Sequence, residues 1–447
     1  MPISGGTFGA MNKVLPGAYI NFVSTKKGFQ RTEIGVVALP LELSWCDESK
    51  VFEITKDDFI NYSEELLGYK NDDEKLLLVL EAFKKASKLL LYRVNKGGVK
   101  ATKTINTLSV TAKHTGEAGN KIAVAVLANV DNSENVDIVT YFGGKEVDRI
   151  TVKANRAGNP LNGENSFVSY TSSGTIAAAV RTSLAGGTNG SASGEDYANA
   201  FKAFETRHFN VIAYCGDDSS IKNTLIAFVN RLRDEDGIKI VGVVSAVENP
   251  DSKGIIAVQC EGGVKVKNRT VSESQLCAWV AGASSAADIN GSNTNALYGE
   301  GEITKPLTKK AQETAIKKGK FVFYQDGKEI KVLADINSLT TFVDGGATED
   351  WTSNRVIRVL DGLAMDIAKI FGESYVGKIT NNDTGRNLFK SDLISLAETY
   401  QRIGAIRDFK AEDIVIKPGT GKRDVEVEMG VIPTDAMEKL YMTVTVM

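Results

Sequence analysis

The sequence has few of the residues from which catalytic and metal sites are usually built: its 447 residues include only four cysteines and two histidines. The cysteines are Cys46, Cys215, Cys260 and Cys277. They are widely separated and form no C-x-x-C pair, which argues against a zinc ribbon and against a disulfide framework. His114 and His208 are too few for a multi-histidine metal site and offer little to a Ser-His-Asp triad. We therefore expect buried cysteines, structural histidines, and a protein that needs no metal and no cofactor.

A strong charge of one sign and long apolar runs are also missing. Lys and Arg number 53 and Asp and Glu 56, for a net charge of −3, and both signs are interspersed. A nucleic-acid binder would instead show a basic stripe. No apolar run approaches the ~18 residues of a membrane-spanning helix, and Met1 to Ala10 lacks the charged head and apolar core of a signal peptide. We expect no nucleic-acid partner, no direct membrane insertion, and a protein that stays in a cytoplasm unless lysis releases it.

Glycine clusters are present, but none completes a phosphate-binding loop. Gly186 to Gly190 lacks the lysine of the G-x-x-x-x-G-K-[ST] pattern, and Gly419 to Lys422 lacks its first glycine and its final Ser or Thr. Glycine clusters more often form turns between domains. We interpret Gly186 to Gly190 as a linker and expect no bound nucleotide.

The chain is long enough for about three domains, and its patterns change along the sequence. Residues 191–350 alternate helical and strand patterns, which predicts an α/β unit with parallel strands. Residues 97–190 consist of short β-rich pieces between Gly, Asn and Asp turns. We predict an N-terminal extended arm at 1–26, an α/β core domain at 27–96 and 191–350, an inserted β-rich outer domain at 97–190, and a C-terminal α+β domain at 351–447 that ends in a strand arm.

Apolar periodicity predicts several helices within these domains. A helix that opens at Asp72 carries an apolar stripe as far as Leu90. Thr175 to Leu184 is a short helical candidate inside the β-rich part. In the last domain, stripes from Val356 to Ile370 and from Phe389 to Ile403 predict two long helices.

The last residues of the chain read as two alternating strands. In the first strand, Val425, Val427 and Met429 share a face. The second strand has two faces, one with Leu440, Met442, Val444 and Val446 and the other with Tyr441, Thr443 and Thr445. Residue types of this kind favour a strand. Such a terminal strand either closes the sheet of its own domain or pairs with another chain, and the segment alone leaves both open.

Two acidic residues follow the predicted strand at Asn210 to Tyr214. Asp217 and Asp218 would lie at the carboxyl end of that strand, where sheets of this kind bind ligands. The alternative, which we favour, is that they cap the next helix and complement its dipole. Cys215 lies nearby, but no base or helix that would lower its pKa is identifiable, so a nucleophilic role is unsupported.

Several stretches together resemble contractile tail sheath proteins, in the form found in phages, phage-like elements and R-type bacteriocins of Gram-positive hosts. The most specific are in the last hundred residues: Arg355 to Phe371, Tyr375 to Lys378, Gly385-Arg386, Leu388 to Lys390, Gly404 to Ile406, Pro418-Gly419 and Pro433 to Val446. Upstream stretches that also match are Thr111 to Asn120, Leu184 to Gly190, and Trp279 to Ala283 with Asn293 and Thr294. The resemblance covers nearly the whole chain.

The resemblance implies a structural subunit, not an enzyme. Such a subunit polymerises with itself, as hexameric rings in a six-fold helical sheath around an inner tail tube protein, and contracts to drive the tube through a target cell envelope. Baseplate and tail-terminator proteins are implied as further partners. The implied location is a phage or bacteriocin tail, assembled in the host bacterial cytoplasm and released by lysis.

The resemblance also assigns the termini. It implies a fold in which terminal strands are exchanged between subunits, so that arms of one copy add strands to the C-terminal domain of a neighbour. The subunit-interface residues are then Ala18, Tyr19, Ile20, Phe22, Val425, Val427, Met429, Leu440, Tyr441, Met442, Thr443, Val444, Thr445 and Val446. The polar side of the second long helix is a candidate for contact with the tube, through Lys390, Asp392, Glu398 and Arg402. An exposed solvated helix face would look the same.

Two functions of other classes remain as alternatives. An enzyme on the α/β core would use Asp217, Asp218 or Cys215, and a surface adhesin would use the β-rich insertion. Neither explains the apolar strand at the end of the chain, whereas the sheath function does.

Overall fold

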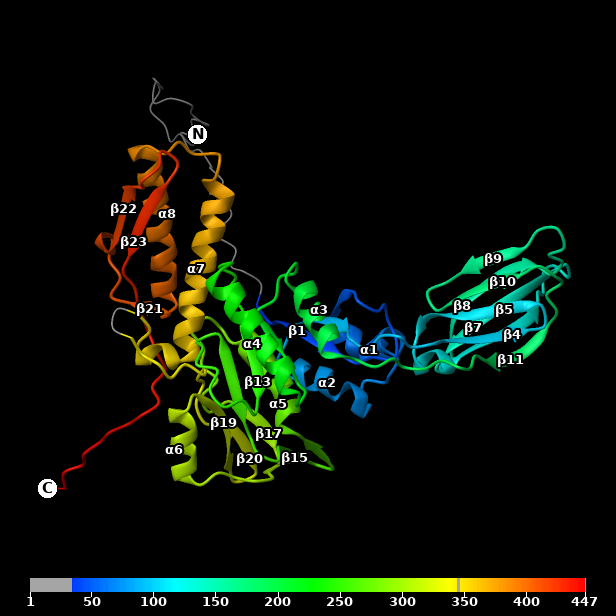
Figure 1. The fold of residues 1–447 in the computed structure, drawn as a ribbon, viewed down its shortest axis with the longest axis horizontal. Coiled ribbons are helices and arrows are strands. Elements are labelled where there is room, and N and C mark those ends of the chain that lie inside the picture. The colour runs from blue at the N-terminus through cyan, green and yellow to red at the C-terminus, as the bar shows by residue number, and fades with distance from the viewer. Residues whose placement is uncertain (1–33, 344–345, 447) are drawn as a thin grey trace, which may run out of the picture. The chain divides into compact units, whose positions relative to one another are not determined.

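The computed structural model describes residues 34–343 and 346–446, and the arm predicted at 1–26 lies outside that range. The described chain is a mixed α/β and α+β multidomain protein (Figure 1). A nine-stranded sheet with helices on both faces forms the α/β part, two four-stranded sheets form a β-rich part, and two long helices with two two-stranded sheets form the α+β part. The mixed α/β and α+β architecture expected from the sequence is confirmed, and the exchange of terminal strands between subunits stays a prediction. Among the described residues, no helix has the length and apolar character needed to cross a membrane.

The nine-stranded sheet is parallel at its centre and antiparallel at both edges. In order across the sheet its strands are β17 (Leu297–Glu300), β20 (Glu329–Val332), β19 (Lys320–Asp326), β14 (Ile255–Gln259), β13 (Val241–Ser245), β12 (Val211–Ala213), β1 (Val36–Leu41), β3 (Lys88–Arg93) and β2 (Val51–Thr55). A three-stranded sheet accompanies it, with β16 (Arg269–Val271), β15 (Val264–Val266) and β18 (Glu302–Ile303).

Helices cover both faces of this sheet because alternate strand residues point to opposite sides. On β1, Val37 and Leu39 belong to one apolar cluster, whereas Val36 and Ala38 belong to the other. The first cluster includes residues of α1 (Lys56–Leu67), α2 (Leu77–Phe83) and α5 (Glu273–Ala286), and the second includes residues of α3 (Gly194–Phe204) and α4 (Ser219–Asp234). The shorter α6 (Lys309–Lys317) packs beside β19.

The β-rich part consists of two antiparallel four-stranded sheets around one apolar cluster. The first sheet runs β4 (Lys100–Ile105), β5 (Leu108–Thr115), β10 (Val168–Ser172), β9 (Leu161–Glu164), and the second runs β11 (Ala179–Ser183), β6 (Ile122–Ala128), β7 (Asn135–Phe142), β8 (Lys145–Lys153). The helix predicted at Thr175 to Leu184 is wrong, because half of this segment is β11, paired with β6, and none of it is helical. Pairing across the sheet overrides the weak helical pattern of so short a segment.

The helix predicted from Asp72 to Leu90 is wrong in its extent. Asp73 caps a single 3-10 turn, α2 then ends at Phe83, and Leu90 lies in β3. The apolar run after α2 is a strand buried on both faces, which periodicity alone does not distinguish from a buried helix.

The C-terminal part is built on α7 (Asn354–Ser374) and α8 (Asp383–Arg402), which lie side by side in Figure 1. Its cluster of buried apolar side chains includes Leu363 of α7 and Leu393 and Tyr400 of α8. Two antiparallel strand pairs complete it: the hairpin of β22 (Ile414–Pro418) with β23 (Val425–Met429), and β21 (Ile406–Arg407) with β24 (Ile432–Pro433), which enclose that hairpin in the sequence. Ser353 and Asn382 accept hydrogen bonds from backbone amides as caps of the two helices.

Candidate functional site

The segment after β24 is the most exposed apolar stretch of the described chain, and it is drawn in red toward the label C in Figure 1. It forms no helix or strand. The exposed fractions are 85% for Leu440, 72% for Met442, 70% for Val444 and 91% for Val446. Four apolar side chains at alternate positions are thus open to solvent. No strand in the described residues pairs with this segment, which we call the C-terminal arm (Lys439 to Val446).

The root of the C-terminal arm is fixed to its own chain. Thr434 donates from its amide to the carbonyl of Ala405 (3.0 Å), and Arg355 donates to the Thr434 hydroxyl (3.0 Å). Among the described residues, the last side-chain hydrogen bond is at Glu438, whose carboxylate accepts from the Thr294 hydroxyl at 2.7 Å. The free part of the arm therefore starts at Lys439.

The first predicted terminal strand, β23, pairs with β22 of the same chain. Val425 faces Pro418, Val427 faces Ile416, and Met429 faces Ile414 in this register. Met429 packs against the buried cluster of the C-terminal part, while Val427 is 38% exposed. The sheet has two strands among the described residues, so β23 has an outer edge with no further strand on it.

The remaining predicted interface residues belong to the N-terminal segment. Ala18, Tyr19, Ile20 and Phe22 lie outside the described residues. Their assignment stays a prediction.

The candidate tube-facing residues lie along α8 but differ in exposure. Glu398 and Arg402 are exposed, whereas Lys390 and Asp392 are half-buried. Asp392 accepts a hydrogen bond from the Tyr375 hydroxyl at 2.6 Å, which ties it to its own domain. Glu398 and Arg402 are thus the two of the four that are open to a partner.

Two of the residues named for the enzyme alternative, Asp218 and Cys215, have roles in the fold. Asp218 caps α4 by accepting hydrogen bonds from the amides of Ser220 (2.8 Å) and Ile221 (3.3 Å), which confirms the capping interpretation for Asp218; for Asp217 it stays a prediction. Those hydrogen bonds and that of the Ser220 hydroxyl lower the pKa of the Asp218 carboxyl. Burial raises the pKa of the Cys215 thiol well above its ordinary value. A thiol in that state is a poor nucleophile at neutral pH.

The other cysteines are similar in chemistry. All four are free, and burial raises the pKa of Cys46, Cys260 and Cys277 to about 12. The described residues contain no group of three or more His, Cys, Asp or Glu side chains placed to hold a metal ion.

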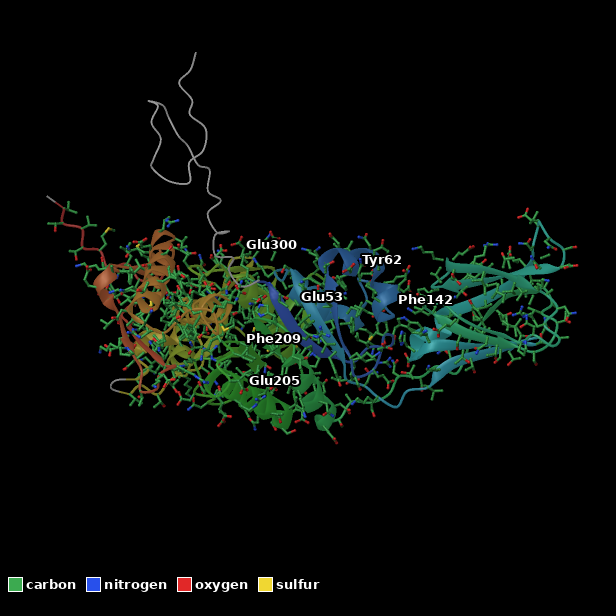
Figure 2. All side chains as sticks on the ribbon, turned by 90° about the horizontal axis from the view of Figure 1, so that it is seen from above. Glu53, Tyr62, Phe142, Glu205, Phe209 and Glu300 are labelled. Carbon is green, nitrogen blue, oxygen red and sulfur yellow. The ribbon has the colours of Figure 1, made fainter. Side chains whose placement is uncertain are left out.

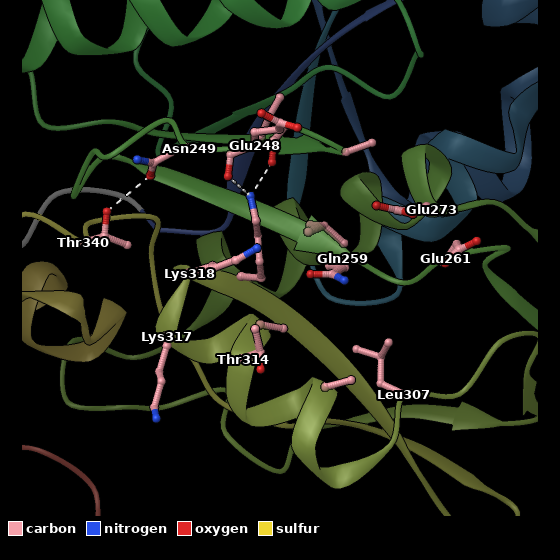
Figure 3. Close-up of a pocket in the computed structure, with 16 residues that line it drawn as sticks. Glu248, Asn249, Gln259, Glu261, Glu273, Leu307, Thr314, Lys317, Lys318 and Thr340 are labelled. Carbon is pink, nitrogen blue, oxygen red and sulfur yellow. Dashed lines mark hydrogen bonds between the residues drawn. The ribbon is translucent and has the colours of Figure 1, made fainter.

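A cleft of about 940 Å³ opens between α6 and the carboxyl ends of β13 and β14 (Figure 3). Two of its charged groups, those of Lys320 and Glu273, are engaged with backbone. The ammonium of Lys320 donates to the carbonyls of Val247 and Glu248, and the carboxylate of Glu273 accepts from backbone amides at Ala246 and Cys260. Burial lowers the pKa of Lys320 and raises that of Glu273. These groups hold the loop after β13 in place.

Two residues at the boundary between the α/β part and the C-terminal part were not anticipated from the sequence. Arg233 of α4 is 2% exposed and forms a two-pronged ion pair with Asp361 of α7, with N–O distances of 2.8 and 2.9 Å. It also donates to the carbonyl of Ile240 at 2.7 Å. A single Arg inside an amphipathic helix carries no sequence signal that names its partner 128 residues away.

Four family descriptions match successive parts of the chain. They are the tail sheath protein Gp18 domain III N-terminal region at residues 35–94, the phage tail sheath protein beta-sandwich domain at 96–189, the phage tail sheath protein central domain at 190–338, and the phage tail sheath C-terminal domain at 347–447. Together they leave little of the described chain unmatched.

Relatives match over nearly full length. Two Bacillus subtilis (strain 168) proteins, the uncharacterized protein YqbK and the phage-like element PBSX protein XkdK, are 32% and 31% identical, with 99% of this chain and 100% of each relative covered. The crystal structure of a sheath tail protein from Desulfitobacterium hafniense superposes with a TM-score of 0.81 at 35% identity, covering 95% of this chain and 99% of the other. For a sheath tail protein from Listeria innocua the values are 0.81, 32%, 93% and 96%. The anti-feeding prophage helical sheath in its contracted state shares the fold, with a TM-score of 0.57 at 11% identity, covering 96% of this chain and 99% of the other. The chain therefore belongs to the phage tail sheath protein family, whose members are structural proteins of contractile tails.

Proposed function

We propose that this chain polymerises with itself as a six-fold helical sheath around an inner tail tube, and that contraction of the sheath drives the tube through a target cell envelope. The observation that carries the proposal is the C-terminal arm, with four apolar side chains exposed at alternate positions beside a domain whose β23 has an open edge. Membership of the tail sheath family supports it. A phage or bacteriocin tail is the place where this function would be performed.

The joint between subunits is a strand added to β23 of a neighbour. Because β23 spans five residues, an added strand makes about five main-chain hydrogen bonds, each worth a net ~1 kcal/mol. Burying Leu440, Met442, Val444 or Val446 contributes roughly 1.5 to 3 kcal/mol per side chain. Ordering the arm offsets much of this gain. Each joint is weak alone, and repetition at every subunit holds the polymer together.

The partners follow from the same proposal. Baseplate and tail-terminator proteins bound the sheath at its ends, and the tube lies against the polar face of α8. Glu398 and Arg402 are exposed on that face and carry opposite charges. The N-terminal segment with Ala18, Tyr19, Ile20 and Phe22 supplies a second thread between subunits. This function needs no catalytic step and no bound cofactor.

Electron microscopy of the purified protein tests the proposal. Concentrated protein is expected to form hollow, ribbed cylinders, and a reconstruction should show six subunits per ring with a strand of one subunit beside β23 of another. A protein that stays monomeric at all concentrations, with or without a tube protein, would refute the sheath function.

A further inference from the structure

Trp45 connects the α/β part to the β-rich part. It lies in the loop between β1 and β2, but its side chain is 3% exposed and belongs to the apolar cluster of the β-rich part. It is the one member of that cluster, within the described residues, that comes from outside 97–190. Its ring meets those of His114, Phe142 and Phe167, with centroid distances of 4.9, 5.5 and 6.3 Å. The core of the insertion is therefore completed by a side chain that the insertion does not contain.

A buried arginine connects the same two parts. Arg93 ends β3 and is fully buried, and its guanidinium donates both to the carbonyl of Cys46 (3.1 Å) and to the carbonyl of Thr115 (2.9 Å). Glu48 lies 3.9 Å from the same guanidinium and accepts a hydrogen bond from the Thr115 hydroxyl. Burial lowers the pKa of Arg93. One cation thus joins the Trp45 loop to β5.

The two segments through which the chain enters and leaves the β-rich part, at 96–102 and 185–191, are paired with each other. The two crossing segments pair as an antiparallel ribbon at Lys96 with Ser191, at Val99 with Thr188 and at Thr102 with Ala185. Each pairing has two backbone hydrogen bonds of 2.9 to 3.2 Å.

A further contact lies next to this ribbon. Lys121 donates to the carboxylate of Glu64 and to the carbonyl of Gly68, both at 3.0 Å. Figure 2 labels Tyr62 of α1 and Phe142 of β7, which line one surface groove at this boundary. A tethered module would need none of these contacts.

We propose that Trp45 and Arg93 fix the insertion (residues 97–190) to the α/β part as one rigid unit. The insertion then turns together with its subunit when the sheath contracts. Trp45 acts as a positioning residue: it fills the socket formed by His114, Phe142 and Phe167. Without Trp45, the contacts that still hold the two parts together are those of Arg93 and Lys121 and the ribbon at 96–102 and 185–191. The joint rotation of insertion and subunit rests on the sheath function proposed above, whereas the locking of the two parts is a property of the single chain.

The locking is tested on unassembled full-length protein with Trp45→Ala. Hydrogen exchange at the amides of Val99, Thr102, Ala185 and Thr188 should quicken by roughly ten- to a thousandfold, because removing a buried aromatic ring lowers the free energy of local opening. Trypsin should cut after Lys100 sooner than in the wild type. Trp45→Phe should restore most of the protection, since a ring returns to the socket.

Two further variants make the result decisive. Trp351→Ala, which removes an aromatic side chain from the start of the C-terminal part, is the control and should leave exchange in the ribbon unchanged. If Trp45→Ala does not fold, Trp45→Leu takes its place, because it keeps an apolar side chain in the socket. Unchanged exchange and trypsin cleavage in the variant that folds would overturn the proposal.

The joint rotation of insertion and subunit is tested on assembled sheath. Reconstructions of extended and contracted wild-type sheath should resolve the insertion as sharply as the α/β part, and in Trp45→Ala sheath the insertion should blur while the rest stays sharp. If the insertion is blurred in contracted wild-type sheath, the joint rotation is refuted, even where hydrogen exchange shows that the two parts of the single chain are locked. Failure of every variant and of the wild type to form sheath would refute the sheath function and leave the exchange result standing.

Discussion

Removing the C-terminal arm should separate folding from assembly. The perturbation is deletion of residues 439–447, or a single Thr443→Pro change within the arm. In the isolated chain the arm is exposed and unpaired among the described residues, and exposed positions of this kind change the free energy of unfolding by less than about 0.5 kcal/mol. Both variants are therefore expected to melt at the temperature of the wild type.

Assembly should respond strongly to the same changes. In a donated strand, proline at residue 443 removes one ladder donor and leaves one acceptor unpaired, which together cost about 2 to 4 kcal/mol per joint. Because about 1.4 kcal/mol is a factor of ten, the association constant of each joint falls roughly 30- to 700-fold. The lowest concentration at which cylinders form should rise by at least that factor, and the deletion should abolish them.

The assay combines calorimetry with sedimentation and electron microscopy on one preparation. Thr443→Val is the matched control, since it keeps a β-branched side chain and the backbone donor. Met437→Ser is a second control, because Met437 is fully exposed and precedes the arm. Both controls should assemble like the wild type.

Two results would refute this reasoning. If the deleted chain melts at a clearly lower temperature or aggregates as a monomer, the arm belongs to the core of its own domain. If it still forms long cylinders, the N-terminal segment alone joins the subunits.

Three further outcomes are expected from contacts within the subunit. Hydrogen bonds, chiefly that from the Thr341 side chain, hold the pKa of Asp251 at about 2, below its ordinary 3.8, so their stabilisation is present above pH 3.8 and is lost as the pH falls toward 2; Asp251→Asn should melt lower at pH 7 and lose that acid step in calorimetry. Gly116→Ala should destabilise the chain by about 1 to 3 kcal/mol in denaturant melts, because the residue has φ +124° and the new methyl group would clash with the backbone carbonyl of Ser44. Asp361→Asn, which leaves the charge of Arg233 buried without its counterion, should cost about 3 to 5 kcal/mol in the same assay, and equal stability of variant and wild type would contradict the ion pair.

The helical period of 3.6 residues and the strand period of two residues were enough to predict much of the fold. Helices α7 and α8 follow directly from their apolar stripes. The sequence did not distinguish β3 from the end of a helix, because a strand buried on both faces has no alternation to read. The same limit applied to β11, whose partner β6 lies far from it in sequence.

The candidate site divides in the same way. The alternating pattern of the C-terminal arm marks an apolar face, and exposure then shows that this face is uncovered in the single chain. Covering this face requires a second copy of the chain, and the pattern of a single sequence does not show how two copies meet. Contacts such as Trp45 with Phe167 or Arg233 with Asp361 depend on segments that folding brings together, so sequence position does not reveal them.

The exposed C-terminal arm also sets a time limit on the free subunit. Its residues 440–446, LYMTVTV, contain no charge, no proline and no glycine, which is the composition of segments that stack into amyloid-like sheets. In the proposed assembly, every newly made subunit carries this segment uncovered, and two second-order reactions would compete for it: ordered growth on an existing ring and disordered pairing between free arms. The ratio of growing ends to free subunits decides which reaction prevails. Under the proposed function, early nucleation of new rings would therefore be as much a condition for a soluble pool of subunits as it is for a finished tail.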